Sequence, residues 1–93
     1  MTVAIADIRF DYHDYDARGD TLFLSVAKPS GQPPEHAYET PEGHVVECDE
    51  RGTIVSIELL NARWLFKRDG ELRVTLAEHR AIADSHDLEA ALA

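Results

Sequence analysis

Residues 43–60, GHVVECDERGTIVSIELL, contain two apolar runs joined by a charged turn. In the second run, Val55, Ile57 and Leu59 occupy every other position, which is the period of a β-strand. Gly52 can adopt the positive φ that closes a short loop between two strands. The stretch therefore predicts a β-hairpin, and the rest of the chain must pack against it or extend it.

The composition is typical of one small globular domain spanning residues 1–93, with an apolar fraction of 44%. No run approaches the roughly 20 apolar residues of a membrane-spanning helix, and residues 1–12 lack the basic start of a signal peptide. The single Cys48 permits no intramolecular disulfide. We therefore expect a cytoplasmic protein without a membrane partner.

The charge is strongly negative, with 18 acidic and 9 basic residues and a formal net charge of −9. Phosphate backbones are bound chiefly by lysine and arginine, so this balance argues against a nucleic acid partner. It favours a basic protein partner instead. Net negative charge also keeps a small protein soluble, and that simpler explanation remains open.

Further strands are predicted at residues 3–12, 21–26 and 72–76 by alternating apolar positions, and the first two should pair as an antiparallel hairpin. Residues 28–43 contain all four prolines and predict a long loop, with brief pairing at the sheet edge near its end. The expected turn residues of the two hairpins are Asp16, Gly19, Asp20, Asp49 and Gly52.

Residues 61–70 fit two structures. Asn61 is a favourable N-cap and Gly70 a favourable C-terminal cap of a short helix, but Asp69-Gly70 is also a strong hairpin turn. We predict the helix. Asp84 can cap a second, C-terminal helix. The expected fold is α+β: a small, mostly antiparallel sheet of about five strands in meander order, a short helix after the fourth strand and a C-terminal helix.

Two motifs resemble the small bacterial and archaeal domain of unknown function number 2283 (DUF2283). The first, Y-D-x-x-x-D-x-L-[YF], matches Tyr15 to Phe23, and the second, D-x-x-G-x-I-x-x-I-E-x-L-N-A, matches Asp49 to Ala62. The resemblance covers roughly residues 12–62. It implies a compact β-rich fold without an established activity. Members encoded beside small basic proteins that resemble ribonuclease toxins imply an antitoxin-like role.

Polar side chains near the first hairpin are the candidates for chemistry. A D-x-D-x-x-G spacing begins at Asp14, but Arg18 stands where a calcium loop needs a ligand, so that type of site is excluded. A looser metal site or an acid–base pair is the alternative function, an enzyme built on His13, Asp14, Asp16, Asp20 and Glu58. Aspartates in such turns more often cap backbone N–H groups, and we expect no cofactor, no metal ligand and no catalytic residue.

Both faces of the central hairpin are partly apolar, and one short helix cannot cover both, so self-association would complete the burial. The candidate interface residues are Trp64, Phe66, Ile54 and Leu60. The sequence thus favours a homodimeric interaction module with an acidic surface for a basic protein. We expect Ile57 to lie in the core and Glu58 to point to the opposite face.

Overall fold

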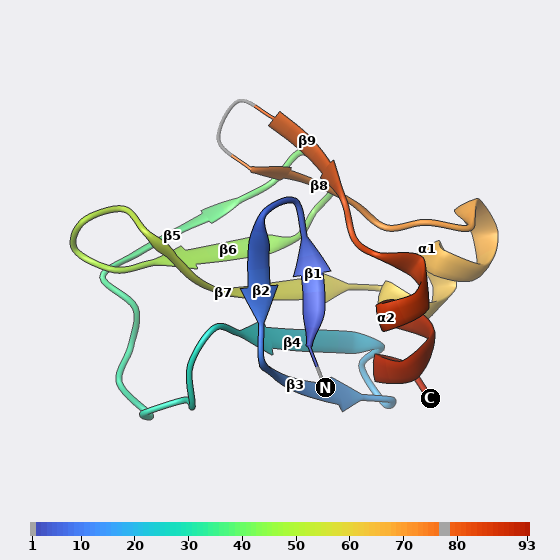
Figure 1. Cartoon of the computed structure of the whole chain (residues 1–93), viewed down its shortest axis with the longest axis horizontal. Helices are drawn as coiled ribbons and strands as arrows, with labels where there is room; N and C mark the ends of the chain where they lie inside the picture. The colour runs from blue at the N-terminus through green and yellow to red at the C-terminus, as the bar shows by residue number, and fades with distance from the viewer. Residues whose placement is uncertain (1, 77–78) are drawn as a thin grey trace.

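A computed structural model describes residues 2–76 and 79–93 of the chain (Figure 1). Within these residues the strands are β1 (Val3–Ile5), β2 (Ile8–Phe10), β3 (Tyr12–Asp16), β4 (Thr21–Ser25), β5 (His36–Glu39), β6 (Val45–Cys48), β7 (Ile54–Leu60), β8 (Arg73–Leu76) and β9 (His79–Ile82). The helices are α1 (Ala62–Asp69) and α2 (Ser85–Ala91). The fold is therefore α+β with a mostly antiparallel sheet, as the sequence predicts.

The main sheet has the strand order β3-β4-β7-β6-β5, and every neighbouring pair is antiparallel. The predicted hairpin of residues 43–60 is confirmed as β6 and β7, with an irregularity in the register between Glu47 and Cys48. The predicted meander order is wrong, because β7 returns to pair with β4. The segment between β4 and β5 consequently runs from one side of the central hairpin to the other.

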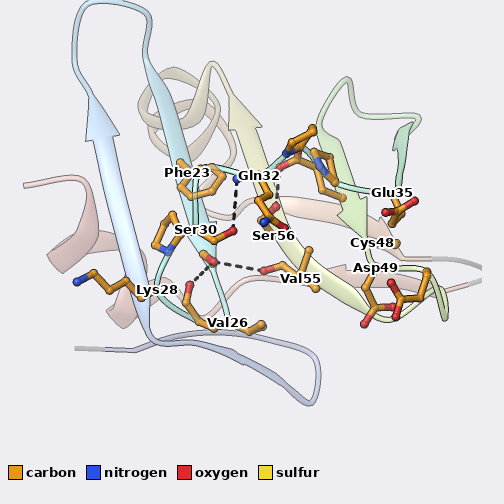
Figure 2. A pocket seen from close by; sticks show the side chains of 18 residues that line it. Phe23, Val26, Lys28, Ser30, Gln32, Glu35, Cys48, Asp49, Val55 and Ser56 are labelled. Carbon is orange, nitrogen blue, oxygen red and sulfur yellow. Dashed lines mark hydrogen bonds between the residues drawn. The ribbon is translucent and has the colours of Figure 1, made fainter.

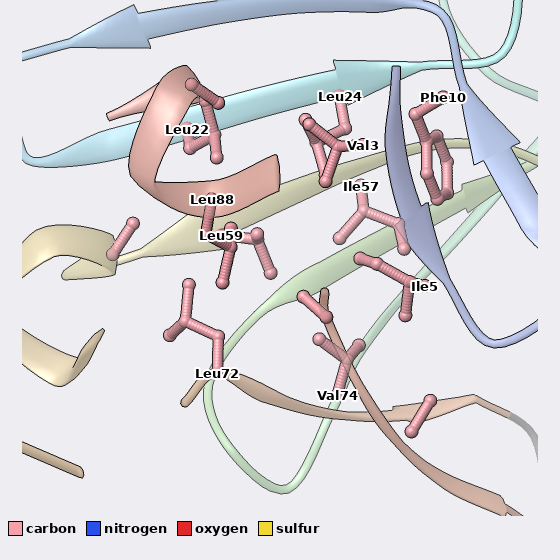
Figure 3. Packing of buried hydrophobic residues seen from close by; sticks show 14 of the residues in the cluster. Val3, Ile5, Phe10, Leu22, Leu24, Ile57, Leu59, Leu72, Val74 and Leu88 are labelled. Atoms are coloured by element: carbon pink, nitrogen blue, oxygen red, sulfur yellow. The ribbon is translucent and has the colours of Figure 1, made fainter. Parts of the chain in front are cut away.

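One face of this sheet forms the core, because alternate side chains of its three central strands point to the same side. Leu22 and Leu24 of β4 lie opposite Leu59 and Ile57 of β7, and all four are fully buried. Val46 of β6 extends this apolar row. The β1–β2 hairpin, the β8–β9 hairpin and α2 cover it, as Figures 1 and 3 show. Burial of these branched side chains supplies the main stabilising term of the fold.

The predicted strand at residues 3–12 is instead two strands and the start of a third. Ala6 has a φ of 55° and lies in a tight turn, so that Val3 of β1 pairs with Phe10 of β2. The partner of β4 is β3, and Tyr12 pairs with Ser25. The alternation of Ile8, Phe10 and Tyr12 passes from β2 into β3 without a break and does not mark the boundary between them, whereas the apolar positions change phase between Ile5 and Ile8, at the turn.

The remaining strands also differ from the prediction in their placement. Residues 73–76 form a strand, but it pairs with β9 in a separate two-stranded sheet. Part of the predicted long loop forms the edge strand β5. The first helix consequently follows the seventh strand of the chain instead of the fourth.

Both predicted helices are present. Gly70 ends α1 with a φ of 75° and donates its N–H to the carbonyl of Phe66 at 2.8 Å. The side chain of Asp84 caps α2 by accepting the N–H of Asp87 at 3.0 Å. Asn61 was expected to cap α1, but its side chain makes no capping hydrogen bond. No helix in the described ranges is long and apolar enough to cross a membrane.

Candidate functional site

The second face of the main sheet is called the open face here, because the covering elements pack on the other side. The registers place five carboxylates on it: Asp14, Asp16, Glu39, Glu47 and Glu58. No lysine, arginine or histidine is among the described strand residues that point to this side. The fold thus concentrates negative charge on the sheet face that lies opposite the core.

A row of side chains crosses the open face over all five strands. Asp14 lies opposite Phe23, Phe23 opposite Glu58, Glu58 opposite Val45, and Val45 opposite Glu39. Neighbouring strands are about 4.8 Å apart, so about 10 Å separates the backbones of Asp14 and Glu58. Phe23 and Val45 are half-buried between the acids. The surface therefore alternates carboxylates with apolar side chains, and Glu58 on the central strand lies at its middle.

The residues proposed for an acid–base or metal site do not converge. His13 lies opposite Leu24 and hence points to the other side of the sheet from Asp14. Phe23 separates Asp14 from Glu58 on the open face. Among residues 2–76 and 79–93, no group of three or more His, Cys, Asp or Glu side chains is placed to hold a metal ion.

Asp20 instead performs a structural task that links the first hairpin to α1. Its carboxylate accepts hydrogen bonds from Tyr15 Oη at 2.7 Å, from the N–H of Arg63 at 2.8 Å and from the N–H of Trp64 at 3.1 Å. Burial alone would raise the pKa of Asp20, but these hydrogen bonds outweigh it and the pKa is lowered. Asp20 therefore caps α1 from the β3–β4 turn, the task that the sequence assigned to Asn61.

The other expected turn carboxylates also bind backbone N–H groups. Asp16 accepts the N–H of Arg18 at 3.0 Å, next to Gly19 in the β3–β4 turn. Asp49 accepts the N–H groups of Arg51 and Thr53, at 2.9 and 3.0 Å. Gly52 has a φ of 80°, a backbone conformation that residues with a side chain rarely adopt. Glu58, by contrast, has no hydrogen bond or ion pair with the described part of the chain.

The four candidate interface residues lie on different parts of the surface. Trp64 is 59% exposed on α1, with the guanidinium of Arg68 stacked 4.7 Å from the ring centre. Phe66 and Ile54 are partly buried against the core. Leu60 is half-buried and belongs to the open face. The structure therefore does not gather them into one patch.

A buried polar junction that the sequence analysis missed joins three segments near the β5–β6 turn. Nδ1 of His44 accepts the N–H of Leu60 at 3.0 Å, and the N–H of His44 binds Thr40 Oγ1 at 3.0 Å. Glu42 accepts hydrogen bonds from the N–H and the hydroxyl of Thr75 at 2.9 and 2.7 Å. Burial lowers the pKa of His44, and nearby Glu42 only partly offsets this. The acceptor role of Nδ1 requires a neutral ring with its proton on Nε2.

A groove of about 640 Å³ lies between residues 27–35 and the open face (Figure 2). Phe23 and Val55 are among the sheet residues that line it, and the turn after β6 lines it on another side. Its size falls in the range of ligand pockets, which are about 300–1,000 Å³. The groove lies on the acidic side of the main sheet.

Comparison with known proteins identifies the central part of the chain. Residues 13–63 match the family model described as "Protein of unknown function (DUF2283)". The chain belongs to the DUF2283 family. No curated protein and no solved structure matches it.

The DUF2283 segment contains the whole five-stranded sheet except the first residue of β3. It therefore includes the carboxylates of the open face, the groove and the Asp20 cap of α1. The β1–β2 hairpin, the β8–β9 hairpin and α2, which cover the core face, lie outside the matched residues.

Proposed function

We propose that this DUF2283 protein is a non-catalytic interaction module whose open face binds a basic protein. The observation that carries the proposal is the sign of the charge on this face: five carboxylates and no basic residue among the described strand positions that point to it. Phe23 and Val45 provide apolar contact area between the acids. Complementary charge steers a partner to such a surface, and apolar contacts between the charges add to the binding.

An antitoxin-like role fits this chemistry. Proteins that cleave or bind RNA carry lysine and arginine on the surface that contacts phosphates. A rigid sheet that presents carboxylates about 10 Å apart can cover such a surface. The attraction would act over roughly the 8–10 Å of a Debye length, so the binding should weaken as salt is added.

The alternative function, an enzyme, receives less support from the geometry. Asp16 and Asp20 are hydrogen-bonded to backbone N–H groups, and Asp14 and Glu58 are separated by a phenylalanine ring. General acid–base chemistry needs groups within hydrogen-bond reach of one substrate atom.

The homodimer is a separate proposal and needs a different surface. Two copies of the open face would repel each other, because carboxylates would face carboxylates. Trp64, the most exposed large aromatic residue of the described chain, is the better candidate for self-association. Sedimentation equilibrium of Trp64→Ala beside the parent protein tests this, and an equal monomer fraction in the two would refute a Trp64-centred dimer.

Affinity capture from the native host tests the proposed function with charge-matched variants. Asp14→Lys combined with Glu58→Lys reverses the charge at two of the five acidic positions and reduces the net charge of the open face from −5 to −1. Asp7→Lys combined with Glu89→Lys makes the same change in net charge on exposed positions of the β1–β2 turn and α2. We expect the parent protein and the second variant to retain one basic protein that the first variant loses.

Two results would overturn the proposal. One is recovery of the parent protein alone, as a monomer, at native concentrations. The other is equal loss of the basic protein from both double variants, since this would show that net charge matters and the open face does not. Circular dichroism of each variant establishes that it is folded before capture.

A further inference from the structure

The groove on the open face is built by a loop held at both ends. At its start, the hydroxyl of Ser25 donates to the carbonyl of Ala27 at 2.6 Å, and the N–H of Val26 donates to the carbonyl of Val55 at 3.0 Å. At its end, β5 pairs with β6. Three prolines between these points restrict the backbone further. Residues 27–35, which form the roof of the groove, are therefore held at both ends without a ligand, and this lowers the entropic cost of binding.

The lining of the groove combines apolar surface with negative charge. Phe23, Val26 and Val55 contribute the apolar part, and Figure 2 shows Phe23 and Val55 on neighbouring strands beside the loop. The acidic side chains that line it are Glu35, Glu47, Asp49 and Glu50. Lys28 is the one basic residue of the lining, and its amino group points away from the groove in Figure 2.

These features select the charge and the shape of the occupant. Anions, including nucleic acid phosphates, would meet four carboxylates against one lysine. A second copy of the open face would bring further carboxylates. A lysine or arginine side chain, by contrast, can lay its aliphatic stem along Val55 and Phe23 while its charged head reaches the carboxylates. The face of the Phe23 ring also attracts a cation.

We infer that the groove beneath residues 27–35 receives a lysine or arginine side chain from an extended segment of the basic partner. This inference rests on the proposed function and adds the identity of an anchoring residue. Glu47 is the central carboxylate, because it lies on the sheet itself and is held by the hydroxyl of Ser56 at 2.5 Å. Its position is fixed, whereas Glu35 and Glu50 extend from loop and turn segments.

An NMR titration with minimal probes tests the inference. Acetyl-lysine amide and acetyl-arginine amide present the cationic side chain, whereas acetyl-norleucine amide and acetyl-citrulline amide are uncharged mimics of similar shape. We expect the cationic probes to shift the amide signals of Phe23, Ser30, Val55 and Ser56. The neutral probes should bind at least five-fold more weakly. Equal shifts from charged and neutral probes, or shifts centred elsewhere, would overturn the inference.

Matched variants show which groups bind the cation. Glu47→Gln removes the charge but keeps an acceptor for Ser56, and it should weaken the cationic probes by at least five-fold. Phe23→Leu keeps apolar volume and loses the ring, which corresponds to about a two- to five-fold loss. Glu89→Gln is the control, because Glu89 is an exposed acid of α2 that does not line the groove. Unchanged binding to the Glu47 variant would refute the assigned role.

The two proposals fail in distinguishable ways. The probes could fail to bind in the groove while Asp14→Lys combined with Glu58→Lys still releases the basic protein. In that case the open face binds its partner without this anchor, and only the inference is wrong. If the probes occupy the groove but the charge reversal leaves the partner bound, the open face is not the interface and the proposed function fails.

Discussion

Replacement of Asp20 by alanine should remove the capping interaction between the first hairpin and α1. The carboxylate of Asp20 accepts two backbone N–H groups of the first helical turn, from Arg63 and Trp64, and the hydroxyl of Tyr15. Loss of an N-terminal cap costs about 1–2 kcal/mol. The hydrogen bond from Tyr15 to a charged acceptor contributes about 1 kcal/mol more in this partly exposed position.

The backbone at this position adds a smaller contribution. Asp20 has a φ of 50°, and left-handed geometry costs alanine about 1 kcal/mol, whereas aspartate and asparagine tolerate it better. We therefore expect Asp20→Ala to lower the free energy of unfolding by about 3 kcal/mol, a large share of the roughly 5–15 kcal/mol typical of a domain. Asp20→Asn keeps an acceptor and the backbone preference, and it should cost about 1 kcal/mol.

Urea denaturation followed by circular dichroism and by the fluorescence of Trp64 measures both variants. Trp64 is a suitable probe because its backbone N–H group is one of those that Asp20 caps. Asp16→Ala is the control, since Asp16 accepts one N–H in an exposed turn and should cost less than about 1 kcal/mol. An Asp20→Ala variant within about 0.5 kcal/mol of the parent protein would refute the assignment of Asp20 as the cap.

Three further predictions concern the buried junction and the core. The pKa of His44 is lowered in the folded state, so the protein should lose stability as the pH falls from about 6.5 through the folded pKa. In His44→Asn, whose side chain can still accept the Leu60 N–H, the urea midpoint should change less between about pH 7 and 5 than in the parent protein. Glu42→Ala leaves the backbone N–H of Thr75 without its acceptor and should destabilise the β8–β9 hairpin locally by about 1–3 kcal/mol, which faster amide exchange in β8 with β1 unchanged would show. Ile57→Asp places an unpaired charge at a fully buried site and should abolish folding by circular dichroism; a soluble, cooperatively unfolding variant would contradict the core assignment.

Local pattern was sufficient to predict the central hairpin and both helices. Strand period, turn chemistry and helix caps are properties of neighbouring residues, and Gly52, Gly70 and Asp84 act in the structure as their local sequence indicates. Asn61 shows the limit of such reasoning. Its residue type favours a cap, yet the carboxylate that caps α1 comes from Asp20, 41 positions earlier in the chain. Any acid that the fold brings to the helix terminus can compete for that role.

Long-range pairing accounts for the parts of the fold that could not be predicted. The adjacency of β4 and β7 depends on partners that are far apart in the sequence, and alternation is the same for any choice of neighbour. The junction of Glu42 and His44 lies in a turn whose sequence reads as an ordinary Pro- and Gly-containing loop. Their function as buried acceptors depends on Leu60 and Thr75, which no local pattern connects to them.

The topology also changes what the two apolar faces of the central hairpin mean. The sequence alone predicts that both faces need cover, with self-association as the simplest source of it. In the structure, the face that contains Ile57 is covered by the chain itself, through the β1–β2 hairpin, the β8–β9 hairpin and α2. The face that contains Glu58 is overlaid by residues 27–35 beside the groove but is not covered by these elements, and it is acidic. Because like charges oppose a second copy there, the physical argument for an interaction surface now favours a partner of opposite charge over self-association through the sheet.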